Sequence, residues 1–204
     1  IKHIIRHIYN PIILNKSEHS YDKDSKTIIS AGRITYQKGF DLLVDVAEIV
    51  LKKYPDWEWI LVGDGEDRLL IETKIKEKGL EGKLILLGNV NNIDEYYEKS
   101  SMYVLTSRFE GFGLVLTEAK AHHLPCVSFK CPAGPAEIII NKNNGFLIEN
   151  FSVNDMAEKI CKLISDKNLR VEFSRKALQD TEKFKIEEIE KQWLGLFEEL
   201  NHEK

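Results

Sequence analysis

Two glutamates eight residues apart, Glu110 and Glu118, flank a glycine-rich stretch that includes Gly111 and Gly113. Carboxylate oxygens accept hydrogen bonds from sugar hydroxyls. Unshielded backbone N–H groups and the positive end of a helix dipole favour phosphate. A sugar joined to a diphosphate carries both kinds of group, so this spacing suggests such a ligand. The alternative is an exposed Glu110 and a Glu118 that only serves the N-terminus of its helix.

A second candidate element supplies positive charge. Arg33 and Lys38 lie between Gly32 and Gly39, after an apolar run and before an amphipathic segment. An arginine can bind phosphate with two parallel donors, and a lysine adds a compact second charge. This element could hold a diphosphate and neutralise it as it leaves. A plain strand-to-helix loop with two solvated cations fits the same residues, which match neither a Walker A motif nor G-x-G-x-x-G.

Six short apolar runs, separated by segments of helical spacing, must position these residues. The expected strands are 27–31, 57–62, 84–87, 102–105, 126–129 and 146–148. The expected helices are 40–50, 67–78, 93–99, 114–122 and 135–140, with further helices from 153 onward.

Apolar strands that alternate with helices indicate a parallel sheet covered on both faces. The expected fold is therefore α/β, a Rossmann-like, doubly wound sheet of about six strands followed by C-terminal helices. Ligands in such folds bind outside the carboxyl ends of the strands. Gly32, Gly63, Gly88 and the stretch from Ser107 to Gly113 all follow expected strands. They should meet at one edge of the sheet.

Composition is that of an ordinary globular protein, with 43% hydrophobic and 30% charged residues. The net charge of −4 lacks the basic excess of nucleic-acid-binding domains, so no nucleic-acid partner is expected. Three cysteines without a C-x-x-C pair favour a reducing compartment, and no apolar run approaches the ~20 residues that span a bilayer. We therefore expect a cytoplasmic protein. Because the chain begins at Ile1 rather than Met, we also expect a fragment of a longer protein.

Together the motifs resemble those of the group 1 glycosyltransferases. The segments that carry the resemblance, in the order and spacing of that family, are Arg33 with Lys38, Gly-Asp-Gly at 63–65, Glu110 to Glu118, Gly-Pro-Ala-Glu-Ile-Ile at 134–139 and Asn-Gly-Phe-Leu-Ile at 144–148. Each motif is weak singly, but jointly they are specific over about residues 9–200. The resemblance implies the C-terminal, donor-binding half of a retaining enzyme with the two-domain GT-B fold. The Cys-Pro-Ala-Gly-Pro run at 131–135 is similar to a bacterial polysaccharide subset of the family.

The resemblance also implies a role for each residue of the donor site. Arg33 and Lys38 would bind the diphosphate, Glu110 would contact sugar hydroxyls, and Glu118 would hold the ribose. The implied backbone contacts to sugar and phosphates come from Gly111, Phe112, Gly113 and Leu114. Those that frame the base come from Gly88, Asn89 and Val90, and Gly32 and Gly63 complete the predicted donor-binding set.

The implied reaction transfers a hexosyl group from a nucleoside diphosphate sugar to an acceptor hydroxyl, with retention at the anomeric carbon. The resemblance favours a UDP-sugar donor, with a GDP-sugar as the alternative, and synthesis of a bacterial surface polysaccharide. Arg33, Lys38 and the helix N-terminus would stabilise the departing diphosphate, and Glu110 completes the predicted catalytic set. No metal or other cofactor is expected, because two cations, Arg33 and Lys38, take the place of a metal ion.

The N-terminal domain that binds the acceptor in this family is missing from the chain. Residues 1–20 are therefore interpreted as a linker, 21–185 as the donor domain, and 186–204 as a helix that crosses back to the missing domain. Its apolar residues are Trp193, Leu194 and Phe197. A terminal helix that packs on its own domain fits the same pattern. The isolated chain is expected to bind nucleotide sugar weakly and not to turn over, and any membrane association would depend on the missing half.

Other functions use parts of the same pattern. A non-catalytic regulatory domain could bind a nucleotide sugar in the same pocket, and an upstream acceptor domain would discriminate against it. A nucleotide-sugar epimerase of the related two-domain kind needs a different cluster of acids and histidines, and a scaffold domain leaves the motifs unexplained. His122, Cys126 and Cys131 superficially suggest zinc, but their spacing is poor for a zinc site.

Overall fold

The computed structural model describes residues 6–11, 21–179 and 181–202. Within these ranges the chain forms one six-stranded, all-parallel sheet with the order β3-β2-β1-β4-β5-β6. Its strands are β1 (Thr27–Ala31), β2 (Glu58–Val62), β3 (Leu84–Gly88), β4 (Met102–Leu105), β5 (Cys126–Phe129) and β6 (Gly145–Ile148).

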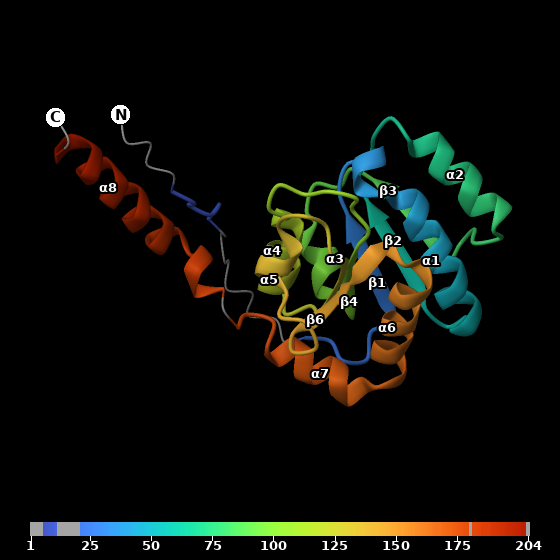
Figure 1. The fold of residues 1–204 in the computed structure, drawn as a ribbon. Helices are drawn as coiled ribbons and strands as arrows, with labels where there is room; N and C mark the ends of the chain where they lie inside the picture. The colour runs from blue at the N-terminus through green and yellow to red at the C-terminus, as the bar shows by residue number, and fades with distance from the viewer. Residues whose placement is uncertain (1–5, 12–20, 180, 203–204) are drawn as a thin grey trace.

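Helices connect and cover these strands, and further helices follow the last strand (Figure 1). The α-helices are α1 (Phe40–Lys53), α2 (Arg68–Glu77), α3 (Asp94–Glu98), α4 (Leu114–Ala121), α5 (Pro135–Ile138), α6 (Val153–Ser165), α7 (Lys167–Arg175) and α8 (Ile186–His202). Three short 3-10 helices are η1 (Tyr36–Lys38), η2 (Glu149–Phe151) and η3 (Glu182–Phe184).

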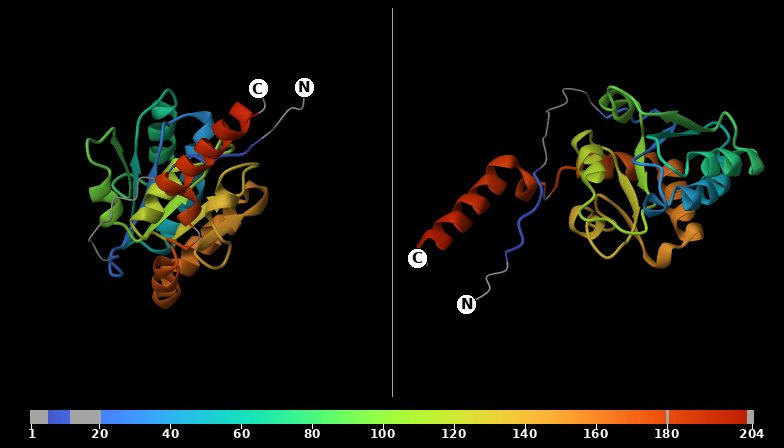
Figure 2. Two further views of the ribbon diagram at one scale, coloured as in Figure 1. Left: turned by 90° about the vertical axis from the view of Figure 1, so that its left-hand side faces the viewer. Right: turned by 90° about the horizontal axis from the view of Figure 1, so that it is seen from above.

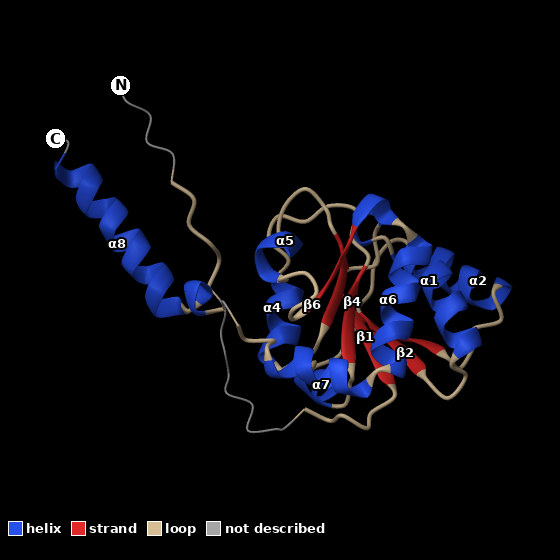
Figure 3. Cartoon of the chain, turned by 60° about the horizontal axis from the view of Figure 1, so that its bottom comes forward, coloured by secondary structure: helices blue, strands red, loops and turns tan. Residues whose placement is uncertain are grey.

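Helices cover both faces of the sheet, with α1, α2 and α6 on one side and α3, α4 and α5 on the other (Figures 1 and 3). Each face has its own hydrophobic core, and Ile28 and Ile29 of β1 belong to different cores although both are fully buried. Successive strand side chains point to opposite faces, so burial of both requires a layer on each side. The expected Rossmann-like, doubly wound fold is confirmed.

Boundaries differ slightly from the sequence-based expectation. Strand β2 begins at Glu58, one residue later than expected, and α5 ends at Ile138 instead of residue 140. Ile139 is extended, with φ −100° and ψ 120°. The next residue, Ile140, donates its N–H to the side chain of Asn144 at 2.9 Å. That side-chain acceptor competes with continued helix, which a periodicity argument does not detect.

The last helix, α8, extends away from the body of the domain, alongside the N-terminal segment (Figure 2). Arg6 of that segment pairs with Glu199 of α8 at 2.7 Å. Trp193, Leu194 and Phe197 are 46–53% exposed. About half of each of these three side chains is thus open to solvent in the structure. Among the helices of the described ranges, none is both long and apolar enough to cross a membrane.

The strand order places a crevice beside β1. From β1 the chain winds outward through β2 to β3, and then returns to β4 on the other side of β1. The loops that leave the carboxyl ends of β1 and β4 therefore lead to helices on opposite faces of the sheet, α1 and α4. Such a reversal of strand order is where ligands bind in open α/β sheets.

Candidate functional site

Strands β1 and β4 separate at the crevice, and side-chain hydroxyls replace the missing ladder bonds. The β1–β4 register ends at the pair Ile29 and Tyr103. Beyond it, Ser30 Oγ donates to the carbonyl of Val104 at 2.6 Å, and the Tyr103 hydroxyl donates to the carbonyl of Ala31 at 3.0 Å. The strand ends are thus held at a fixed separation while their buried polar groups stay satisfied.

The loops after β1 and β4 are joined directly above this point. Thr106 Oγ1 donates to the carbonyl of Lys38 at 3.1 Å, and the N–H of Arg108 donates to the carbonyl of Gln37 at 2.8 Å. The Gln37 side-chain amide donates to the carbonyl of Phe109 at 3.1 Å. Three hydrogen bonds across some 70 residues of sequence therefore set the position of one loop against the other.

Gly39 permits this close approach. Its φ of +64° is left-handed, and a Cβ built on it would lie 2.2 Å from the carbonyl oxygen of Thr106. No side chain fits at that distance from a backbone atom. The residue ends η1 and precedes α1, so the sequence needs glycine here both for the turn and for the contact between loops.

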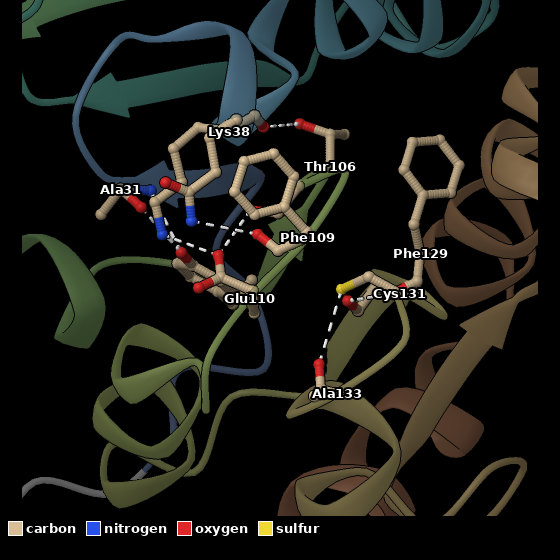
Figure 4. A network of polar contacts seen from close by, with 12 residues as sticks. Ala31, Lys38, Thr106, Phe109, Glu110, Phe129, Cys131 and Ala133 are labelled. Atoms are coloured by element: carbon tan, nitrogen blue, oxygen red, sulfur yellow. Dashed lines mark hydrogen bonds and ion pairs between the residues drawn. The ribbon is translucent and has the colours of Figure 1, made fainter.

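Lys38 and Glu110 meet at the centre of the joined loops (Figure 4). Lys38 Nζ lies 2.7 Å from Oε1 of Glu110, and Ser107 Oγ donates to the same oxygen at 2.6 Å. The Lys38 and Glu110 side chains are only 15% and 7% exposed. Loss of either partner would leave a poorly solvated charge, so the pair fixes both side chains. The structure thus brings together the predicted phosphate cation and the predicted sugar acid.

Arg108, which the sequence did not single out, has a supporting place beside this pair. Its guanidinium binds both carboxylate oxygens of Asp41, at 2.8 and 2.6 Å, and donates to the carbonyl of Tyr36 at 2.8 Å. Burial alone would raise the pKa of Asp41. The hydrogen bonds and charge of Arg108 outweigh it and hold that pKa below its usual value. Arg108 is therefore committed to holding the β4 loop against α1, which leaves Lys38 to face a ligand.

Arg33 lies apart from the Lys38–Glu110 pair. Its side chain is 76% exposed and its nearest anion is Glu66, 3.5 Å away in the loop between β2 and α2. An exposed pair of this length contributes little to stability. Arg33, the second predicted phosphate cation, thus follows the same strand as Lys38 but is solvent-exposed and pairs with Glu66 instead of Glu110.

Glu118 lies on the first turns of α4, four residues after Leu114 and hence on the same helical face. Helix α4 begins after Gly113, whose φ is +94°. The hydroxyl of Tyr97, on α3, donates to Oε2 of Glu118 at 3.2 Å. Burial, followed by the nearby charges of Tyr103 and Glu118, raises the pKa of Tyr97. The phenol therefore stays protonated and acts as a donor to the carboxylate.

A hollow of about 260 Å³ lies beside the Lys38–Glu110 pair and the start of α4. The residues that line it are Asn10, Lys38, Glu110, Phe112, Gly113, Leu114 and Val115. It thus contains five of the residues predicted for the donor site. Asn10 was not predicted. It belongs to the N-terminal segment, where the ring of Tyr9 packs against Phe112 at 5.8 Å and Phe184 at 5.0 Å.

Three other predicted residues, Gly32, Gly63 and Gly88, lie together where β1, β2 and β3 end. Gly63 donates its N–H to the carbonyl of Gly88 at 2.8 Å, and a Cβ on Gly63 would lie 2.0 Å from the carbonyl oxygen of Gly32. Gly63 is therefore explained first by its contact with the backbone of Gly32. Asn89 is exposed and Val90 half-buried just beyond them. Gly111 is exposed, and a Cβ there would meet nothing within 4 Å.

His122, Cys126 and Cys131, the residues that superficially suggest zinc, are used for packing and local contacts. His122 Nε2 lies 3.1 Å from Asp94, and Cys126 is fully buried in β5, where burial raises the pKa of its thiol to about 12. Cys131 contacts the carbonyl of Ala133 in the loop after β5 (Figure 4). No group of three or more potential metal ligands occurs within the described ranges.

Comparison with known proteins points to one family. The family model described as "Glycosyl transferases group 1" matches residues 12–180. The amylovoran biosynthesis glycosyltransferase AmsD of Erwinia amylovora is 35% identical over 180 residues, which is 88% of this chain and 50% of the relative. The chain spans about half the length of the first curated relatives that it matches.

Two solved structures are similar in fold and sequence. A Staphylococcus aureus TarM mutant in complex with fondaparinux, α-GlcNAc-glycerol and UDP matches 93% of this chain and 38% of its own, with a TM-score of 0.89 and 34% identity. The C-terminal domain of a group 1 family glycosyl transferase, LpcC, from Francisella tularensis matches 79% of this chain and 88% of its own. Its TM-score is 0.71 at 34% identity.

Proposed function

Because this chain belongs to the group 1 glycosyl transferases, we propose that it is the donor-binding half of a retaining hexosyltransferase. The complete enzyme moves a hexosyl group from a nucleoside diphosphate sugar to an acceptor hydroxyl in the synthesis of a bacterial surface polysaccharide. Residues 1–20 are the linker from an N-terminal acceptor domain, 21–185 are the donor domain, and 186–204 are a crossover helix.

The observation that carries the proposal is the place of the Lys38–Glu110 pair. It lies at the crevice between β1 and β4, in a hollow that also contains the start of α4. A cation and the N-terminus of a helix attract phosphate, and a carboxylate accepts sugar hydroxyls. The Lys38 ammonium, the N-terminus of α4 and the Glu110 carboxylate lie at one hollow, so together they suit a ligand in which a phosphate is bonded to a sugar.

The donor lies across the carboxyl ends of the strands in this proposal. Lys38 and the free N–H groups of α4 bind the diphosphate, and Arg33 turns from Glu66 to add a second charge. Glu110 binds the sugar through the carboxylate oxygen that Lys38 and Ser107 leave free. Glu118 binds the ribose, and the backbone of residues 88–90 borders the base.

Catalysis then rests on stabilising the leaving group. The bond between the anomeric carbon and a diphosphate oxygen breaks, and negative charge accumulates on that oxygen. Lys38, Arg33 and the end of α4 stabilise this charge without having to reorganise during the reaction. These groups make a divalent metal unnecessary. The acceptor hydroxyl forms the new bond on the same face, which gives retention, and its proton passes to the departing diphosphate oxygen.

Uracil is the favoured base of the donor, which would then be a UDP-sugar. The TarM structure that matches 93% of this chain contains UDP. In this proposal the nucleoside lies over the ends of β2 and β3, where Asn89, just beyond the buried Gly88, is exposed. A GDP-sugar is the alternative, and the two are distinguished by direct titration.

The acceptor half of the enzyme is proposed to lie on the side of α8. The N-terminal segment and α8 extend together from the body of the domain (Figure 2). The exposed face formed by Trp193, Leu194 and Phe197 supports a packed partner there, because exposed large apolar patches mark interaction surfaces. Without that half, the chain binds donor and does not turn over.

Calorimetric titration with UDP, GDP and ADP, without metal, tests the proposal. We expect saturable binding of UDP near the millimolar range, about −4 kcal/mol, and roughly tenfold weaker binding by Lys38→Met and Glu118→Gln. Lys130→Met is the matched control, because Lys130 is exposed and pairs with Glu149 away from the crevice. Absence of binding by all three nucleotides at about 10 mM, or equal affinities in all variants, contradicts the proposal.

A further inference from the structure

Each glutamate of the proposed donor site has one oxygen already engaged by a buried hydroxyl. Ser107 Oγ donates to Oε1 of Glu110 at 2.6 Å, and the Tyr97 hydroxyl donates to Oε2 of Glu118 at 3.2 Å. Ser107 and Tyr97 are both fully buried. The two acids come from different segments of the chain, yet each is held in the same way.

Both hydroxyls are attached to rigid surroundings. Ser107 lies between Thr106 and Arg108, whose hydrogen bonds join the β4 loop to the β1 loop. Tyr97 is packed edge-on against Tyr103, with ring centroids 6.1 Å apart, and its ring is tilted against that of His122 at 5.3 Å. A donor that cannot move restricts the carboxylate that it binds.

This restriction matters for ligand binding because a glutamate side chain has three rotatable bonds. A freely rotating carboxylate loses that freedom when it binds a ligand hydroxyl, and the loss weakens binding. A carboxylate that is already held in its binding orientation avoids the loss. In Glu110 the engaged oxygen also contacts Lys38, so neither Lys38 nor Ser107 occupies the other oxygen, Oε2.

We propose that Ser107 and Tyr97 are positioning residues that orient the two acids for different parts of the donor. Ser107 orients Glu110 toward a hydroxyl of the transferred sugar, and Tyr97 orients Glu118 toward a hydroxyl of the ribose. This inference rests on the proposed function. It adds that the two contributions are separable, since the hydroxyls act on different carboxylates.

Titration of Tyr97→Phe and Ser107→Ala chains tests this separation. The probes are UDP, 2′-deoxy-UDP, and whichever of UDP-glucose, UDP-galactose and UDP-N-acetylglucosamine binds the wild-type chain most tightly. Tyr97→Phe should weaken UDP binding roughly five- to tenfold and reduce the preference for UDP over 2′-deoxy-UDP. Ser107→Ala should leave UDP binding within about twofold and reduce the preference for the UDP-sugar over UDP by about fivefold or more.

Two controls remove the same groups far from the site. Tyr21→Phe deletes a half-buried phenol that donates to the carbonyl of Ser101 at 2.7 Å, before β4 begins. Ser152→Ala deletes the cap of α6, whose Oγ accepts from the N–H of Asp155 at 3.2 Å. Both controls should lower stability yet keep wild-type affinities and wild-type preferences between ligands.

The outcomes separate the inference from the proposed function. Failure of the wild-type chain to bind any of the nucleotides removes the proposed function and the inference with it. Binding by the wild type, with both variants indistinguishable from their controls, overturns the inference alone. So does a uniform loss of affinity for all probes in either variant, because this would mean that the hydroxyls only support the fold. A wild-type chain that does not distinguish any UDP-sugar from UDP overturns the role of Ser107.

Discussion

Substitution of Gly39 by alanine should separate the loop after β1 from the loop after β4, which meet at the proposed site. A Cβ at this position would lie 2.2 Å from the carbonyl oxygen of Thr106, whereas ordinary contact begins near 3.4 Å. The loops must then move apart by about 1 Å, at the cost of a hydrogen bond or an overpacked contact. The left-handed φ of +64° adds a backbone penalty of about 1–2 kcal/mol. We expect a total loss of about 3–5 kcal/mol.

Gly79→Ala provides the matched control. Gly79 has nearly the same φ, +66°, but a Cβ there would meet nothing within 4 Å. It should therefore lose only the backbone penalty of about 1–2 kcal/mol. Urea unfolding followed by circular dichroism measures both, and the difference of about 2–3 kcal/mol reports the contact with Thr106. Equal destabilisation by the two substitutions would refute the idea that backbone contact at Gly39 holds the loops together.

Three further predictions concern the rest of the fold. The folded protein lowers the pKa of Asp41, so the wild type should be more stable than Asp41→Asn by up to about 1 kcal/mol above pH ~4. Urea unfolding at a series of pH values should show this difference vanish as the pH falls through the pKa that Asp41 has in the folded protein. Ser30→Ala should lower the free energy of unfolding in urea by about 1–3 kcal/mol, because the Trp59 indole N–H donates to Ser30 Oγ at 3.1 Å and would lose its acceptor. The double variant Ser30→Ala, Trp59→Phe should lose less than the sum of the two single variants, because the same hydrogen bond is removed in each. Trp193→Ser and Phe197→Ser should change the stability of this chain by less than about 0.5 kcal/mol, since both side chains are exposed, and a loss above about 2 kcal/mol would show that α8 packs on this domain.

Local sequence patterns were sufficient to predict most of the fold. Apolar runs such as the one through Ile28 and Ile29 are buried on both faces, and only a parallel sheet with two helical layers provides that environment. The glycines also predicted the turns, as Gly79 does at the end of α2. Periodicity was less informative where a side chain competes with the backbone, as Asn144 does after α5.

The pairing within the site was beyond the reach of sequence reasoning. Lys38 and Glu110 were both identified, but nothing local indicates that residues 72 positions apart form an ion pair. Arg108 was not identified from the sequence, where its position beside the glycine-rich loop fits a role in binding phosphate as well as a structural role. Only the structure shows its guanidinium bound by Asp41. Tyr97 looks like an ordinary core aromatic in sequence, and its donation to Glu118 depends on how α3 packs against α4.

The location of nucleotide binding tests the account most directly. In a two-dimensional ¹⁵N–¹H NMR titration with UDP, we predict shifts in the backbone N–H signals of residues 32–39, 88–90 and 110–118. Another hollow, of about 410 Å³, lies between α1 and α6 and includes Lys53 and Lys162. Shifts confined to that hollow, or spread evenly over the surface, would contradict a donor site at the crevice between β1 and β4.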